Sequence, residues 1–172
     1  MTTETKIFAG VGLVTLLVIV GGAFLITKKD EKPGRPLMGQ EITIESRTHV
    51  PESTKINYNS NPPAAGEHYG ITAHGGIYDK APADGNLVHS LEHGAVILWY
   101  KADLPQADIK KLQDIYYNSP GIKKIMTPRE NLDVPVALSS WGRVLKLTTI
   151  DEKQIKDFFE VNKDRGPETA PI

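Results

Sequence analysis

Two histidines, His89 and His93, stand four residues apart in the sequence, with Glu92 between them. On a helical turn, side chains at this spacing share one face, so both imidazoles can bind a single metal ion. Gly94 can end such a turn, and the apolar run 95–100 that follows is typical of a buried strand. A carboxylate beside two histidines is a ligand, a partner that orients a ligand, or a general base. This stretch therefore predicts half of a metal site.

The remaining ligands cannot be thiolates, because the 172-residue chain has no cysteine. His68 and His49 are the leading candidates, and His74 is the third. The Pro62-Pro63 pair and Gly66 predict a fixed turn that presents His68 rigidly. A site made of imidazoles suits zinc or copper, and the ligand type does not choose between these metals. The alternative is that the histidines form only hydrogen bonds that join a loop to the sheet.

The order His-x-x-Glu-His over residues 89–93 is also the motif of the inverzincin peptidases. In those enzymes the motif lies within a longer helix, whereas here Gly94 and a strand follow at once. A metal-dependent hydrolase with Glu92 as base is therefore an alternative, and the sequence leaves open whether the protein is an enzyme.

Other functions lack their motifs. The chain has no Gly-x-Ser-x-Gly elbow, dinucleotide-binding glycine motif or Walker lysine. Its net charge of −1 suggests no nucleic-acid partner.

The patterning around these residues predicts a small α+β domain with one mixed sheet, two packed helices and a long ordered loop rich in proline and glycine. The loop runs from Thr48 to about Leu87 and contains more tyrosine and isoleucine than a disordered linker carries. Two helices are expected at 105–117 and 151–162. The expected strands are 41–46, 95–100, 122–126, 134–139 and 143–148, and the last two form a hairpin around Trp141-Gly142. The order of the strands is left open.

The N-terminal part of the chain predicts attachment to a membrane. The residues from Ile7 to Ile26 carry no charge, and a helix of this length crosses the hydrocarbon core of about 30 Å. In this interpretation residues 1–6 are a tail, 7–27 a transmembrane helix, 28–40 a juxtamembrane linker, 41–168 the soluble domain and 169–172 a second tail. A cleaved signal peptide is the competing interpretation. By charge alone, Lys28 and Lys29 would place the domain in the cytoplasm.

Several strings of residues resemble one known family. They are 58–69 around His68, 76–78, and 88–94 around His89 and His93, together with His49-Val50-Pro51, Thr127 to Arg129, Trp141 to Arg143 and Gly166 to Glu168. With these strings the chain resembles, from about Thr48 to Glu168, the uncharacterised bacterial and archaeal family called domain of unknown function 3105. It departs from the family's pattern at Ala64-Ala65, where Thr-Ser is commoner, and at Glu67, where Pro is commoner.

The resemblance implies that His49, His68, His89 and His93 belong to one motif set, and it supplies no activity. Members of the family commonly look like single-span proteins whose domain follows an N-terminal anchor on the outer side of the membrane. We therefore expect a single-pass cell-membrane protein whose extracytoplasmic domain binds copper or zinc through these four histidines. Membrane-protein subunits are its expected partners, with neither a nucleotide nor a nucleic acid among its ligands. A subunit with a purely structural or interaction role, without metal, is the remaining alternative.

Overall fold

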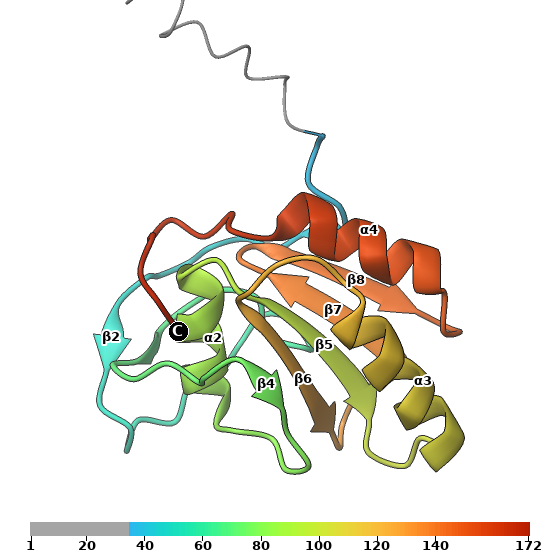
Figure 1. Ribbon diagram of the computed structural model, residues 1–172. Helices are drawn as coiled ribbons and strands as arrows, with labels where there is room; N and C mark the ends of the chain where they lie inside the picture. The colour runs from blue at the N-terminus through green and yellow to red at the C-terminus, as the bar shows by residue number, and fades with distance from the viewer. Residues whose placement is uncertain (1–34) are drawn as a thin grey trace, which may run out of the picture. The chain divides into compact units, whose positions relative to one another are not determined.

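The structure is a computed structural model that describes residues 35–172. The expected tail 1–6, transmembrane helix 7–27 and the linker as far as residue 34 lie outside the described residues. Within 35–172, none of the helices has the length and apolar character needed to cross a membrane. The elements, in chain order, are β1 (Gln40–Glu41), β2 (His49–Val50), β3 (His68–Tyr69), β4 (Gly76–Ile77), α2 (Asp84–Glu92), β5 (Val96–Lys101), α3 (Gln106–Tyr117), β6 (Lys124–Arg129), β7 (Val136–Ser140), β8 (Arg143–Leu147) and α4 (Glu152–Asn162) (Figure 1).

Six of the strands form one mixed sheet in the order β1-β8-β7-β5-β6-β4. The strands β4, β6 and β5 are parallel to one another, and α3 provides the crossover between β5 and β6. On the other side of β5 the pairing is antiparallel, between β5 and β7, β7 and β8, and β8 and β1. The hairpin of β7 and β8 turns at Trp141-Gly142, where Gly142 has a φ of +69°. The mixed sheet, the α+β class and this hairpin therefore agree with the prediction from sequence.

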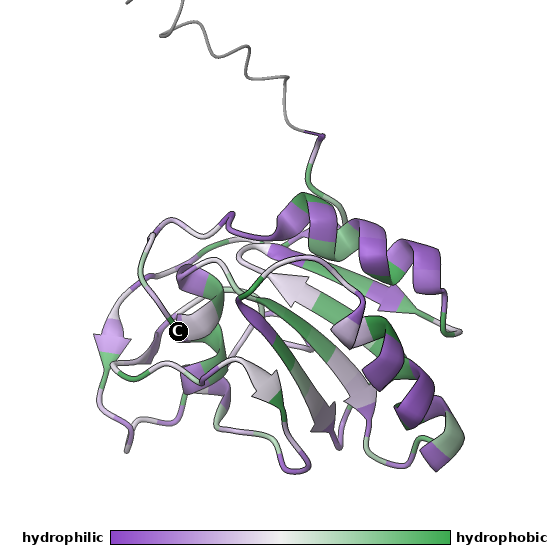
Figure 2. Ribbon diagram, viewed as in Figure 1, coloured by the Kyte–Doolittle hydropathy of each residue, from purple (hydrophilic) through white to green (hydrophobic). Residues whose placement is uncertain are grey.

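The two faces of the sheet are covered by different helices. On β5, Val96, Leu98 and Tyr100 join the apolar core beneath α3 and α4. The alternate residues Ile97 and Trp99 join a second core that includes apolar residues of α2. Figure 2 shows this arrangement, with hydrophobic colour on the central strands and hydrophilic colour on the outer faces of α3 and α4. Because both faces are covered, β5 is buried over almost its whole length, as its continuous apolar sequence predicts.

The prediction of two helices is wrong, because the structure contains a third, α2, over residues 84–92. The sequence Asp84-Gly85-Asn86 has the residue types of a turn, so the expected loop extended to about Leu87. In the structure, burial of Leu87, Val88 and Leu91 against the sheet outweighs that local preference. The predicted strand 41–46 is also too long, since only Gln40–Glu41 pairs with β8.

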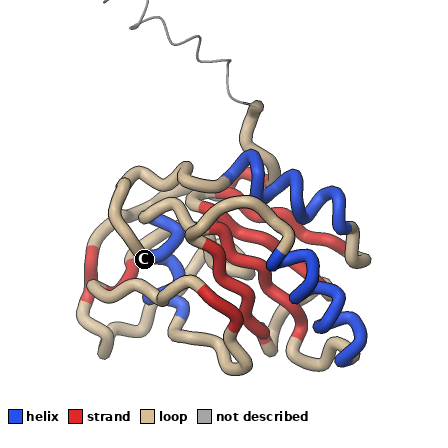
Figure 3. The backbone as a smooth tube through the Cα atoms, in the orientation of Figure 1, coloured by secondary structure: helices blue, strands red, loops and turns tan. Residues whose placement is uncertain are grey.

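The long segment between β2 and α2 is irregular, yet specific hydrogen bonds fix it. The hydroxyl of Tyr69 donates to the carbonyl oxygen of Thr54, and the side chain of Asn86 donates to that of Ile71. Within this segment β3 pairs with β2 in parallel, so that His49 lies opposite His68. Figure 3 shows the loops running around α2 and the two short strands. The segment therefore holds His68 near the C-terminal end of α2.

Candidate metal centre

Three histidines and one glutamate meet where β2, β3 and the C-terminal turn of α2 come together. Each of His49, His68, His89 and Glu92 offers one ligand atom, and these four atoms all lie within 4.8 Å of one another. The pairing of β2 with β3 places His49 beside His68, and their ring centroids are 4.7 Å apart. The three-residue spacing of His89 and Glu92 places both on one face of α2. The group thus combines residues from three elements.

A hydrogen bond to the backbone of Gly66 fixes the orientation of the His68 ring. Its Nδ1 lies 2.9 Å from the carbonyl oxygen of Gly66, which can only accept, so Nδ1 carries the proton and donates. The opposite nitrogen, Nε2, lies 2.9 Å from Oε2 of Glu92, but the geometry there is not that of a hydrogen bond. With its proton on Nδ1, His68 thus brings an unprotonated Nε2 close to a carboxylate oxygen. This repulsive approach becomes favourable when a cation lies between the two atoms.

His49 and His89 also face each other, and their Nε2 atoms form a hydrogen bond when one of the two carries a proton. Their Nε2 atoms are 3.3 Å apart, and ligand atoms about 2.0–2.1 Å from a tetrahedral metal ion are separated by roughly this distance. Nδ1 of His89 is buried and has no hydrogen-bond partner among residues 35–172. Burial of His89, and then the charges of His93, His68 and His49, lower its pKa from 6.5, against the opposing effect of Glu92. The fold thus favours the neutral imidazole that a metal requires.

Three members of the group are buried and one is exposed. His68, His89 and Glu92 lie in the interior, whereas His49 is exposed and forms the solvent side of the group. Arg47 lies on the same side, and its Nε donates to Oε1 of Glu92 over 3.2 Å. Glu92 therefore uses one oxygen toward Arg47 and the other toward His68. Nothing in the spacing of the sequence predicted the contact between Arg47 and Glu92, which are 45 residues apart.

His93 stands next to this group, as its spacing from His89 predicts, with ring centroids 4.5 Å apart. Both of its ring nitrogens, however, contact the C-terminal segment 166–172. Its Nδ1 donates to the carbonyl oxygen of Pro171 at 2.8 Å, and its Nε2 lies 3.3 Å from Oε2 of Glu168. His74, the third upstream candidate, is exposed and is not a member of the group. The structure thus brings together three of the four histidines expected to bind metal, and adds Glu92 to them.

A short C-terminal extension also closes over the end of α2. The backbone N–H of Glu168 donates to the carbonyl oxygen of Glu92, and Lys123 donates to the carbonyl oxygens of His93 and Ala170. Gly166 lies so close that a Cβ on it would be 2.1 Å from that same Glu92 oxygen. The C-terminus consequently lies beside α2 (Figure 1). The resemblance had included Gly166 to Glu168 as a motif, and this contact gives the motif a structural reason.

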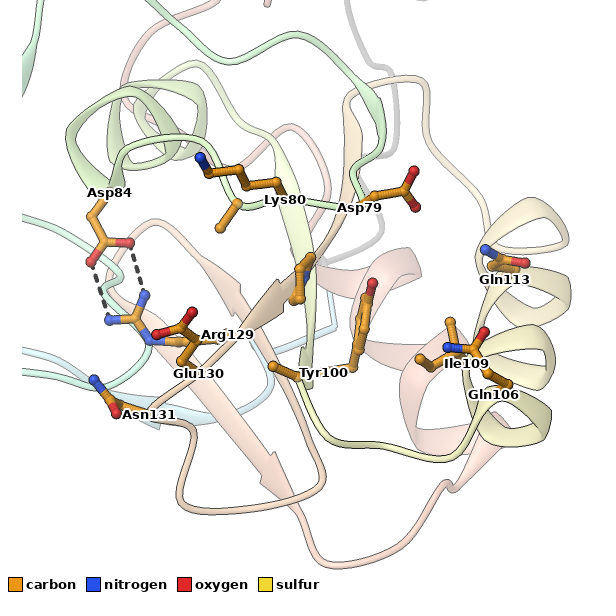
Figure 4. A pocket seen from close by; sticks show the side chains of 13 residues that line it. Asp79, Lys80, Asp84, Tyr100, Gln106, Ile109, Gln113, Arg129, Glu130 and Asn131 are labelled. Carbon is orange, nitrogen blue, oxygen red and sulfur yellow. Dashed lines mark hydrogen bonds and ion pairs between the residues drawn. The ribbon is translucent and has the colours of Figure 1, made fainter.

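A pocket of about 640 Å³ lies near the opposite end of α2 and is a separate feature (Figure 4). At one side of it, Arg129 forms a two-pronged ion pair with Asp84, the first residue of α2, at 2.8 and 3.1 Å. Figure 4 shows Gln113 on α3 at the other side and Tyr100 between them. Burial, followed by the charge of Asp79, raises the pKa of Tyr100. None of the four grouped residues lines this pocket, so it is not the candidate metal centre.

An α+β domain that gathers three histidines and a glutamate at one end of a helix defines the class of this protein as a candidate transition-metal-binding domain. The chain belongs to the protein family of unknown function DUF3105, whose model matches residues 49–171. The match begins at His49 and ends at Pro171, so it contains the whole group and both C-terminal residues that contact His93. It confirms the resemblance drawn from the sequence. No curated protein and no solved structure matches the chain.

Proposed function

We propose that this protein binds one transition-metal ion, zinc or copper, through His49, His68 and His89. Glu92 serves either as the fourth ligand or as the partner of a water molecule on the metal. The observation that carries the proposal is the approach of His68 Nε2 to Glu92 Oε2 at 2.9 Å without hydrogen-bond geometry. Buried polar atoms in native proteins have partners, and an ion between these two atoms would supply one.

The chemistry of the donor set supports zinc or Cu(II) within this proposal. Imidazole nitrogen is the ligand that both ions share, and the group contains no thiolate or thioether of the kind that favours Cu(I). The hydrogen bond from His68 Nδ1 to Gly66 is the usual support behind a metal-binding histidine, because it fixes both the tautomer and the ring orientation. Arg47 does the same for Glu92 by holding the oxygen that faces away from His68. His68 and Glu92 are thus oriented before the ion arrives.

The test is a titration of the chelator-stripped, full-length protein with Zn(II) and with Cu(II), accompanied by elemental analysis of the native protein. We expect one ion per chain in the wild type and in His74→Ala, whose histidine lies outside the group. The variants His68→Ala and His89→Ala should lose this binding. Thermal unfolding of each metal-free variant shows whether it still folds. Binding of one ion per chain by a folded His68→Ala, His89→Ala double variant would refute the proposal.

A metal-dependent hydrolase is the second candidate, and a specific observation favours it. Catalytic zinc ions are commonly held by three protein ligands and keep a fourth position for water. Here three histidines supply such a set, and Glu92 lies within reach to act as the base. Glu92→Gln separates the two roles. Normal metal affinity with loss of hydrolytic turnover indicates a base, whereas weakened metal affinity indicates a ligand.

We further propose that the domain is anchored in the cell membrane by residues 7–27 and lies on the extracytoplasmic side, as an accessory to a membrane-protein complex. The uncharged run from Ile7 to Ile26 supports the anchor. The side follows the expectation drawn from the family resemblance, and the charges of Lys28 and Lys29 oppose it. Membrane fractionation followed by protease treatment of intact cells tests both points.

An absence of metal from the native protein, with no effect of chelator on its unfolding, would favour the alternative of a structural or interaction subunit.

A further inference from the structure

We propose that the metal centre binds a small anion, and that Arg47 is the residue that holds it. This inference rests on the proposed function, since it requires a metal ion on His49, His68 and His89. It goes further by naming the chemical class of the ligand, a small oxyanion such as bicarbonate, a carboxylate or phosphate. It also assigns a binding role to a side chain outside the histidine motifs.

The first argument is the charge of the loaded centre. A divalent ion held by three neutral imidazoles, with the carboxylate of Glu92 beside it, keeps a net positive charge. The guanidinium of Arg47 adds a second positive charge only one carboxylate group away, because its Nε lies 3.2 Å from Oε1 of Glu92 while Oε2 faces His68. An open coordination position beside two such charges attracts an anion and repels a cation.

The second argument is the hydrogen-bonding capacity that Arg47 has left. Its Nε donates to Glu92, whereas its terminal amino groups Nη1 and Nη2 have no partner among residues 35–172. A guanidinium presents its donors in a planar fork that matches two oxygens of a carboxylate or phosphate. Arg47 can therefore keep its contact with Glu92 and bind an oxyanion with the other donors. A lysine at this position would supply a charge without that fork.

The third argument is access. The buried members His68 and Glu92 have side chains that are 0% and 2% exposed, so a ligand cannot approach from their side. Arg47 is 51% exposed, and His49 is the exposed member of the group. An incoming molecule therefore meets the metal along the side on which Arg47 lies. The centre is separate from the 640 Å³ pocket, so we expect the ligand at the centre to have only a few atoms.

The experiment uses the full-length protein loaded with Cu(II) and titrated with azide, whose charge-transfer absorption reports an anion on the copper. Bicarbonate, acetate and phosphate then compete with azide, and their order identifies the preferred class. We expect Arg47→Gln to weaken azide binding about tenfold or more, since it removes a charge-assisted contact. Arg47→Lys should restore part of the affinity. The matched control is Lys153→Gln, which removes one positive charge from α4, the helix on the other face of the sheet.

Copper content is measured for every variant, so that the two proposals fail separately. Full copper content with equal azide affinity in the wild type and Arg47→Gln overturns the anion site and leaves the metal site intact. Full copper content with no azide absorption in the wild type does the same, because no position is then open to an anion. A wild-type protein that holds no copper and no zinc overturns both proposals.

Discussion

The side chain of Ser90 forms hydrogen bonds with both backbone groups of Ala73. Its Oγ donates to the carbonyl oxygen at 2.8 Å and accepts from the amide nitrogen at 2.9 Å, and both contacts are buried. Ala73 lies in the irregular segment that follows β3, whereas Ser90 lies on α2 between His89 and Glu92. One hydroxyl therefore fixes the loop to the helix at the turn that supplies two members of the candidate centre.

Ser90→Ala should destabilise the domain by about 1–3 kcal/mol, because it leaves buried backbone groups of Ala73 with poorer partners. It should also weaken metal binding. The contact between Ser90 and Ala73 fixes α2, which supplies His89, against the segment that supplies His68. Chemical denaturation and a zinc titration measure the two effects. Ser53→Ala is the control, since Ser53 is exposed in the same irregular segment. Equal stability of the two variants would show that the hydroxyl does not fix the loop.

Metal binding should raise the thermal stability of the protein. A ligand that binds only the folded state at about 100 times its dissociation constant adds about 2.7 kcal/mol to the free energy of unfolding. We therefore expect an increase of several degrees in the unfolding temperature with Zn(II), reversed by a chelator. His89→Asn should abolish the increase, and His74→Asn should retain it. An increase of the same size in His89→Asn would mean that the ion binds elsewhere.

The sequence contained much of the scaffold and only part of the centre. The continuous apolar sequence of β5 and the turn at Trp141-Gly142 are local signals, so both were predicted correctly. The parallel pairing of β2 with β3, which places His49 opposite His68, depends on two-residue strands in a loop, and no periodicity marks it. The sequence therefore indicated which histidines could bind a metal. Which of them meet in one place depends on tertiary contacts.

The four-residue spacing of His89 and His93 correctly predicted that their rings are neighbours, but it did not predict the other contacts of His93. His89 and His93 are adjacent, as residues four apart on a helix must be. The partners of His93 are Pro171 and Glu168, and the first of these is 78 residues away in the chain. Such a contact leaves no pattern near His93 itself. The same holds for Arg47, which reaches Glu92 from a segment without regular structure.

The metal-free protein should become less stable as the pH falls through the range below 6.5. Burial, and then the charges of His93, His68 and His49, lower the pKa of His89 in the folded state. The unfolded chain then binds a proton that the folded chain does not, so stability is present above pH 6.5 and is lost as the pH falls toward the folded pKa. The slope for one proton cannot exceed about 1.4 kcal/mol per pH unit.

Denaturation of the chelator-treated protein between pH 5 and 8 measures this dependence. His89→Asn should flatten it, because the substituted side chain does not titrate, whereas His74→Asn should leave it unchanged. A wild-type profile that His89→Asn does not alter would assign the dependence to other groups.

Gly166→Ala should release the C-terminal segment from α2. A methyl group at this position would lie 2.1 Å from the carbonyl oxygen of Glu92 and 2.3 Å from the amide nitrogen of Gly94. Both are backbone atoms of the helix end, so the segment must move, at a cost of about 1–3 kcal/mol. Movement would break the hydrogen bond from Glu168 to Glu92 and free both nitrogens of His93.

Gly70→Ala is the matched control, because no atom lies within 4 Å of a Cβ at that position. Proteolysis of the C-terminal segment and chemical denaturation compare the two variants. We expect faster cleavage and lower stability for Gly166→Ala alone. If zinc affinity nevertheless stays at the wild-type value, the centre is complete without the C-terminal segment, as the grouping of His49, His68, His89 and Glu92 implies. Equal cleavage of both variants would contradict the contact between Gly166 and α2.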